Sequence, residues 1–208
     1  MNTQVFQGKN IRLTIFDAEH DAECLARWSQ DSEYQQLQSS GPSSLWSVKQ
    51  IKDWMEKHYA EMYSFTIRTL ADDRAIGSVD LGGIDWVVGN AWIGIGIGER
   101  EYWGKGYGTD AMNVFLGFAF GSLNLKRISL TVFEYNERAI KSYIKVGFKE
   151  EGRQRQWMQR AGQRFDLVFM GILREEWDER QRVAQAEQSK PRPDEYEIEK
   201  DSNEHQAA

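Results

Sequence analysis

The chain has 208 residues, of which 40% are apolar, and its formal charge is −6. This length suits one well-buried domain with an extension, and the acidic balance argues against a nucleic-acid partner bound by a basic surface. A single cysteine, Cys24, excludes a disulfide framework and a cysteine metal site. The N-terminus has no basic, apolar leader and the apolar runs are too short to span a bilayer, so we expect a cytoplasmic protein with no membrane partner.

The first half of the chain predicts one strand, two helices and an antiparallel meander. Alternating apolar residues predict a strand at residues 11–15. Asp17 is expected to cap a first helix, and a capping box of Ser47 and Gln50 opens a second. Residues 31–46 between them have no periodicity and are interpreted as a loop. Three antiparallel strands are then expected, at residues 63–67, 76–86 and 91–98.

The second half predicts two more helices and three more strands. The segment 111–120 is apolar nearly all round, which predicts a central, well-covered helix. A strand is expected next, at residues 127–133, and Asn136 then caps a short helix that Gly147 ends. The last two strands are expected at residues 148–157 and 165–173, joined by a turn at 160–163. The total is about seven strands and four helices, an α+β (mixed α/β) fold.

The apolar pattern stops near residue 179. From there the chain has eight acidic and five basic residues, which carry −3 of the −6 charge. Such a segment buries too little apolar surface to offset its ordering entropy. We therefore expect one domain at residues 1–178 and a disordered, charged tail at 179–208.

The glycine-rich stretch 103–109, Trp-Gly-Lys-Gly-Tyr-Gly-Thr, joins the fourth strand to the apolar helix. Its three glycines allow a sharp turn with inward-pointing amides, and the following helix adds unpaired N–H groups and its positive dipole end. Because Lys105 is the only formal charge, this cradle binds phosphate mainly through the main chain and predicts a phosphorylated cofactor. The alternative is a glycine-rich turn that merely caps a helix.

The strand before this loop has an unusual composition. Ile93, Ile95 and Ile97 share one face, and glycines 94, 96 and 98 leave the other face bare. A bare strand face predicts the close approach of another group, and the alternative is a bulge or a tight crossing of two elements.

Two other phosphate-binding patterns compare less well with the loop. Residues 106–111 fit the G-x-G-x-x-A pattern of a dinucleotide-binding turn, with Glu134 placed for the ribose. However, a meander precedes the loop and a hairpin follows it, which is the wrong topology for that fold. A Walker loop fails because no Gly-Lys-Ser/Thr follows at the required spacing.

The arrangement resembles the GNAT superfamily of acyl-CoA-dependent N-acyltransferases. Three blocks match in order: Ile93 to Thr109, Asn136 to Tyr143, and Lys145 to Phe148. Within the superfamily the chain looks most like the branch of ribosomal-protein N-terminal and spermidine acetyltransferases, over about residues 8–178. The resemblance implies a mostly antiparallel sheet that splays open between its fourth and fifth strands.

The resemblance also implies acetyl-CoA as acyl donor, with no metal. It places Tyr143 near the departing thiolate as general acid, and it places Asn136 against the cofactor. The pantetheine arm is expected along Gly96, Ile97 and Gly98. The pyrophosphate loop that it implies consists of Trp103, Gly104, Lys105, Gly106, Tyr107, Gly108 and Thr109.

The chain departs from the family pattern at two positions. Trp103 stands where the glycine loop commonly begins with Arg or Gln, and Trp92 stands where many relatives have a catalytic glutamate. The general base is therefore not given by a motif. The candidates near strand ends or in mid-strand are Asp80, Glu134 and, less favoured, Glu99. His20 and His58 lie on expected helices and are interpreted as structural or surface groups.

The sequence thus predicts transfer of an acetyl group from acetyl-CoA to a primary amine by direct attack in a ternary complex. The acceptor is a protein N-terminus, a polyamine or another small amine. Its specificity is expected to depend on residues 31–46, the Gly82-Gly83 strand and the 158–164 turn. The alternatives are a non-catalytic acyl-CoA-binding or regulatory module and, more weakly, a dinucleotide-binding protein. The oligomeric state, including a homodimer, stays open.

Overall fold

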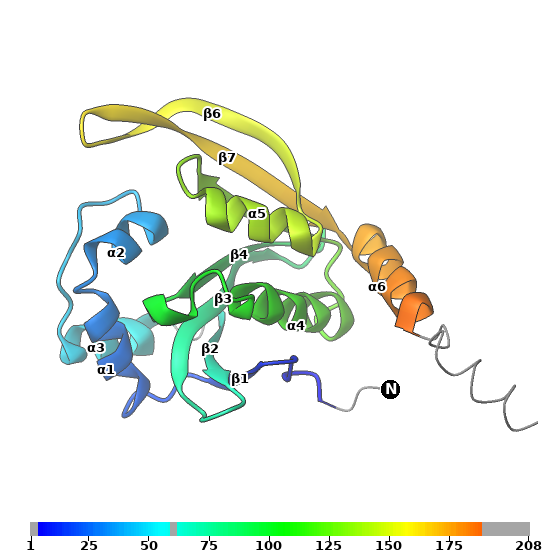
Figure 1. Cartoon of the computed structure of the whole chain (residues 1–208), viewed down its shortest axis with the longest axis horizontal. Coiled ribbons are helices and arrows are strands. Elements are labelled where there is room, and N and C mark those ends of the chain that lie inside the picture. Colours follow the sequence, from blue (N-terminus) through cyan, green and yellow to red (C-terminus); the bar gives the residue numbers. More distant parts are fainter. Residues whose placement is uncertain (1–3, 59–61, 189–208) are drawn as a thin grey trace, which may run out of the picture. The chain divides into compact units, whose positions relative to one another are not determined.

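The computed structural model describes residues 4–58 and 62–188. Residues 1–174 form one unit around a seven-stranded sheet with the order β1-β2-β3-β4-β5-β7-β6 (Figure 1). Neighbouring strands are antiparallel except β4 and β5, which are parallel. The strands are β1 (Ile11–Ile15), β2 (Tyr63–Thr69), β3 (Ala75–Asp85), β4 (Asn90–Ile97), β5 (Arg127–Phe133), β6 (Lys149–Arg160) and β7 (Gln163–Leu173). The expected mixed α/β fold is confirmed.

Five α-helices and one 3-10 helix accompany the sheet in the described part of this unit. Figure 1 shows α1, α2 and α3 grouped at one end of it. The helices are α1 (Asp21–Trp28), α2 (Ser32–Gln38), α3 (Val48–His58), η2 (Arg100–Tyr102), α4 (Tyr107–Gly121) and α5 (Glu137–Val146).

Local hydrogen bonds explain several helix ends. The Gln50 N–H donates to Ser47 Oγ over 3.2 Å, and the Ser47 N–H donates to Gln50 Oε1 over 3.0 Å, so the predicted capping box opens α3. Asn136 Oδ1 accepts from the Ala139 N–H over 3.2 Å at the start of α5. Gly147 ends that helix with a φ of 120°, a conformation that favours glycine.

Two expectations for the N-terminal half are wrong. Asp17 does not cap α1, because its carboxylate accepts the Glu19 N–H over 2.9 Å within a turn, and the helix begins only at Asp21. The segment 31–46 is not all loop, since it contains α2. Asp31 caps that helix by accepting from the N–H groups of Glu33 and Tyr34 over 3.0 and 3.1 Å.

The apolar helix α4 is central, as predicted. Phe115, Leu116 and Phe120 are at most 1% exposed, because apolar side chains cover most of the helix circumference. Phe115 packs edge-on against Phe65 of β2, with ring centroids 5.7 Å apart. The helix therefore presents its N-terminus, at the glycine loop, from a fixed position.

A second unit begins at Glu175, and the structure describes its residues up to Gln188. Helix α6 (Arg174–Gln188) occupies the first part of the expected disordered tail, and residues 189–208 lie outside the described part. Its sequence is rich in Glu, Gln, Arg and Ala, which are good helix formers, so local propensity accounts for regular structure without an apolar stripe. None of the described helices is long and apolar enough to cross a membrane.

Candidate active site

The sheet opens between β4 and β5. Their parallel pairing runs only from Asn90 with Arg127 to Trp92 with Ser129, although β4 continues to Ile97 and β5 to Phe133. A pocket of about 1200 Å³ lies at this opening, lined by β3, β4, β5, α2, α5 and the glycine loop. The splayed sheet that the family resemblance implied is therefore present.

The glycine loop faces the open space of this pocket. Gly104 and Gly106 have φ values of 71° and 89°, in the left-handed region that favours glycine, and a Cβ on either would meet no heavy atom within 4 Å. Gly106 is the N-cap of α4 and has no side chain with which to cap it. The first-turn N–H groups are thus left for a ligand, and the loop fits an anion.

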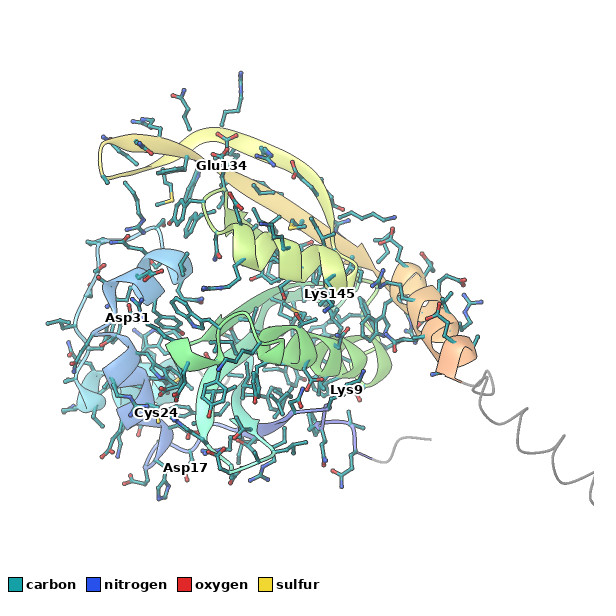
Figure 2. All side chains as sticks on the ribbon, viewed as in Figure 1. Lys9, Asp17, Cys24, Asp31, Glu134 and Lys145 are labelled. Carbon is teal, nitrogen blue, oxygen red and sulfur yellow. The ribbon has the colours of Figure 1, made fainter. Side chains whose placement is uncertain are left out.

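Positive side chains gather around the same end of the pocket. Arg138, Lys141 and Lys145 line it from one face of α5, and Lys105 lines it from the loop (Figure 2 labels Lys145). The Thr109 and Ser142 hydroxyls, 2.8 Å apart, link α4 to α5 beside them. These groups suit a polyanion such as a diphosphate.

One carboxylate lines the pocket from β3. Asp80 is on β3 opposite Gly94 of β4, and a Cβ on Gly94 would come within 2.6 Å of its Oδ2, so the glycine makes room for it. Burial raises the pKa of Asp80 to about 6. Burial, with the charge of Asp80, also raises the pKa of the Tyr34 phenol from α2. Among the described residues lining the pocket, the other carboxylate is Glu137, which pairs with Lys141 over 3.1 Å.

Tyr143 and Asn136 both line the pocket from α5 and its cap. Burial raises the pKa of Tyr143 to about 12, so its hydroxyl keeps its proton at neutral pH. Asn136 is only 8% exposed and is held by its capping bond to Ala139. The structure brings these two predicted residues into one space with Asp80 and the glycine loop.

The bare face of β4 is covered by the protein itself. A Cβ on Gly98 would overlap the indole ring of Trp28, and one on Gly96 would come within 2.7 Å of the Tyr34 hydroxyl and 2.9 Å of Gln38. The Gly98 N–H also donates to Ile76 O over 2.8 Å. Gly98 is outside the pocket lining and packs against Trp28. Gly96 and Ile97 do line the pocket.

Two candidate bases lie elsewhere. Glu134 is outside the pocket lining, near the β6–β7 hairpin in Figure 2, and its Oε2 accepts the Asp166 N–H over 2.9 Å. Glu99 is also outside the lining and accepts the Trp28 indole N–H over 2.8 Å. Burial would raise the pKa of Glu99, but the bonds from Trp28 and Arg27 outweigh it and lower that pKa. Both carboxylates hold elements together, and neither lines the pocket.

Other predicted residues are placed as follows. Trp103, Gly104, Lys105, Gly106, Gly108 and Thr109 line the pocket, whereas Tyr107 is outside the lining and packs its ring on Tyr102 with centroids 4.9 Å apart. His20 is an exposed surface group beside Asp17, and the side chain of His58 lies outside the described part. Across residues 4–58 and 62–188, no group of three or more His, Cys, Asp and Glu side chains is placed to hold a metal ion.

Several pocket residues were missed in the sequence, among them Tyr34, Gln38 and Arg138. Tyr34 and Gln38 come from α2, whose only clear sequence signal was the capping Asp31. Arg138 lies inside the matched block that begins at Asn136. Whether its side chain points into the pocket depends on how α5 is rotated about its axis, which the sequence alone does not give. The available signal was the spacing of Arg138, Lys141 and Lys145, which places three basic residues on one face of the expected helix.

The family model and the similar proteins that match this chain all describe acetyltransferases. Residues 11–149 match the family model described as acetyltransferase (GNAT) domain. The chain is 30% identical over 164 residues to the putative ribosomal N-acetyltransferase YdaF of Bacillus subtilis (strain 168), covering 78% of this chain and 88% of that protein. It is 34% identical over 103 residues to the spermidine N(1)-acetyltransferase of Escherichia coli (strain K12), covering 50% of this chain and 55% of that protein.

A solved structure has the same fold. The spermidine N-acetyltransferase of Vibrio cholerae, crystallised with CoA and spermine, superposes with a TM-score of 0.72 at 24% identity. The superposition covers 80% of this chain and 97% of that one.

Proposed function

The chain belongs to the acetyltransferase (GNAT) family, and from that premise we propose that it transfers an acetyl group from acetyl-CoA to a primary amine by direct attack in a ternary complex. The observation that carries this proposal is the pocket at the β4–β5 opening, where an anion cradle and one half-buried carboxylate with a raised pKa line the same space. A binding module without turnover would need the cradle but not the carboxylate.

We assign the donor to the glycine-loop end of the pocket. Acetyl-CoA, when bound, supplies a thioester-activated acetyl group. Gly104, Gly106, Gly108 and the first turn of α4 would hold its diphosphate through main-chain N–H groups, with Lys105 adding charge. Gly96 and Ile97 would hold the pantetheine arm, and Asn136 would contact it from the α5 cap. Trp103 and Thr109 complete the wall.

We assign the general base to Asp80. An amine attacks only when neutral, so a group in the pocket must remove a proton at neutral pH. A carboxyl with a pKa of about 6 is mostly ionised there, yet it binds a proton more readily than an ordinary Asp. Tyr143, which keeps its proton at Oη, is assigned as the acid for the leaving sulfur. Residues that fix both substrates in one pocket supply much of the remaining rate.

The acceptor end of the pocket favours a particular kind of amine. Trp92, Phe133 and Leu167 line it with apolar surface, and Asp80 is its carboxylate. An apolar wall suits one amine next to an apolar group, whereas a polyamine would bury further cations without partners. We therefore place a peptide N-terminus or an apolar monoamine ahead of spermidine, although one relative is named for spermidine.

We also propose the bounds of the enzyme domain and the compartment in which it acts. The enzyme domain is proposed to cover residues 1–178, with 179–208 as a charged extension, and to act in the cytoplasm on amines or peptides. The net charge of −6, half of it in residues 179–208, opposes a nucleic-acid partner.

A thiol-release assay tests the function. Acetyl-CoA is incubated with free-amine peptides, apolar monoamines and spermidine, and peptides with an acetylated N-terminus and no lysine serve as matched controls. We expect CoA release with free amines, none with the blocked peptides, and little with Asp80→Asn. Release no greater than background with every acceptor would instead support the non-catalytic acyl-CoA-binding module.

A further inference from the structure

The indole ring of Trp103 is a fixed part of the glycine loop. Its Nε1–H donates to the carbonyl oxygen of Ile97, at the end of β4, over 2.6 Å. The ring also lines the pocket directly before Gly104. This residue stands where the family resemblance led us to expect Arg or Gln, so the loop begins with an aromatic face in place of a cation or an amide.

Two guanidinium groups lie over that ring. The Cζ of Arg138, from α5, is 3.9 Å from the ring centroid, and the Cζ of Arg100, from η2, is 5.2 Å away. Both distances are within the range of a cation–π interaction, and the indole is the strongest natural partner for one. Trp103 can therefore orient a charge that belongs to another element.

The two arginines differ in their partners. Arg100 Nη2 donates to Asp31 Oδ1 over 2.6 Å, and Arg100 Nη1 lies 2.5 Å from Glu33 Oε2, so its charge is neutralised. Arg138 has no carboxylate within ion-pairing distance among the residues that the structure describes, and it lines the pocket. Burial lowers the pKa of Arg138, and the charge of Arg100 adds to this although Glu33 opposes it. Arg138 thus lacks the anion that Arg100 already has.

We propose that Arg138, held on the face of Trp103, binds the diphosphate of CoA and supplies the cation that this loop lacks at its first position. This inference rests on the proposed function. A guanidinium matches two phosphate oxygens at once, which a single Lys105 ammonium cannot do. The Thr109 to Ser142 contact keeps α5 next to the loop, so the guanidinium and the main-chain N–H groups act on one ligand.

Isothermal titration with CoA and with 3′-dephospho-CoA tests the assignment. The proteins are the wild type, Arg138→Gln, Arg138→Lys and Trp103→Leu. Arg153→Gln is the matched control, because Arg153 lies outside the pocket lining on β6 and pairs with Glu150. We expect Arg138→Gln to weaken both ligands by about 10- to 100-fold, the loss of one charge-assisted phosphate contact. The affinity of Arg138→Lys should lie between those of Arg138→Gln and the wild type, because lysine keeps the charge but not the forked guanidinium.

Trp103→Leu should weaken both ligands by about 3- to 10-fold, because Arg138 remains but loses its support. Combined with Arg138→Gln it should add little, since the two side chains act as one unit. Thermal unfolding of each variant establishes that it is folded before titration.

Three results would overturn the assignment. Arg138→Gln could bind both ligands as tightly as Arg153→Gln, which would remove Arg138 from the site. A loss confined to CoA, with 3′-dephospho-CoA unaffected, would place Arg138 at the 3′-phosphate instead. A wild type that binds neither ligand would overturn the proposed function, and this inference with it.

Discussion

Asp80→Asn is expected to stabilise the folded protein at neutral pH while removing most of its activity. Asp80 is half-buried on β3 opposite Gly94 of β4, and its partial burial raises its pKa from the ordinary 3.8 to about 6. The native state is therefore less stable once this carboxyl ionises. An amide of nearly the same shape does not ionise, so the variant avoids that cost but has no base.

The size of the effect follows from the pKa. The difference between 3.8 and about 6 corresponds to about 3 kcal/mol, at about 1.36 kcal/mol for each pKa unit. Because the folded pKa is raised, the wild type binds more protons when folded, and its stability falls as pH rises from about 4 to about 6. The advantage of the variant should thus grow by about 2 kcal/mol between about pH 4.5 and about pH 7.5.

Urea unfolding across this pH range measures the stability, and kcat/KM measured over the same range should show an acid limb near pH 6 in the wild type. We expect Asp80→Asn to lower kcat by about 10²- to 10⁴-fold. Glu134→Gln is the control, because Glu134 lies outside the pocket lining, and it should stay close to wild type in turnover. A stability difference that does not change with pH would contradict the raised pKa of Asp80, and full turnover by Asp80→Asn would contradict its role as the base.

Three further changes separate chemistry, packing and binding. Tyr143→Phe should lower kcat by at least about 10-fold while leaving acetyl-CoA affinity within a few-fold, as steady-state kinetics and titration can determine, and an unchanged kcat would remove Tyr143 from proton transfer. Gly98→Ala forces the Trp28 ring to move and should cost about 1–3 kcal/mol in urea unfolding, whereas Gly117→Ala, in open space on α4, should gain about 0.5–1 kcal/mol; equal effects would contradict the packing role of Gly98. Gly106→Val strains a backbone with a φ of 89° and should weaken acetyl-CoA binding by about 10-fold or more, with wild-type affinity as the contrary result.

The bounds of two strands were predictable from alternating apolar residues, but their buried faces were not. The strands Ile11–Ile15 and Arg127–Phe133 have the predicted bounds, yet Ile15 is exposed and Arg127–Phe133 is largely buried on both faces. Helix α2 was missed because Ser32–Gln38 has no buried residue and thus no apolar stripe. Its position depends on Asp31, which caps it and also holds Arg100 from a distant part of the chain.

The candidate site was likewise only partly predictable from the sequence. The glycine loop follows from the spacing of Gly104 and Gly106, since both need positive φ and both lie in one short segment. The function of Gly98 depends on Trp28, which is remote in sequence and brought there only by folding. Asp80 and Glu134 were equal candidates in the sequence, and only the burial of one and the hairpin contact of the other separate them.

Isothermal titration of acetyl-CoA into the wild type and Gly106→Val tests whether the β4–β5 pocket binds the acyl donor. We expect saturable binding of one acetyl-CoA per chain to the wild type, and binding at least about 10-fold weaker to the variant. No binding to the wild type at concentrations well above micromolar would contradict the assignment of the β4–β5 pocket to acetyl-CoA.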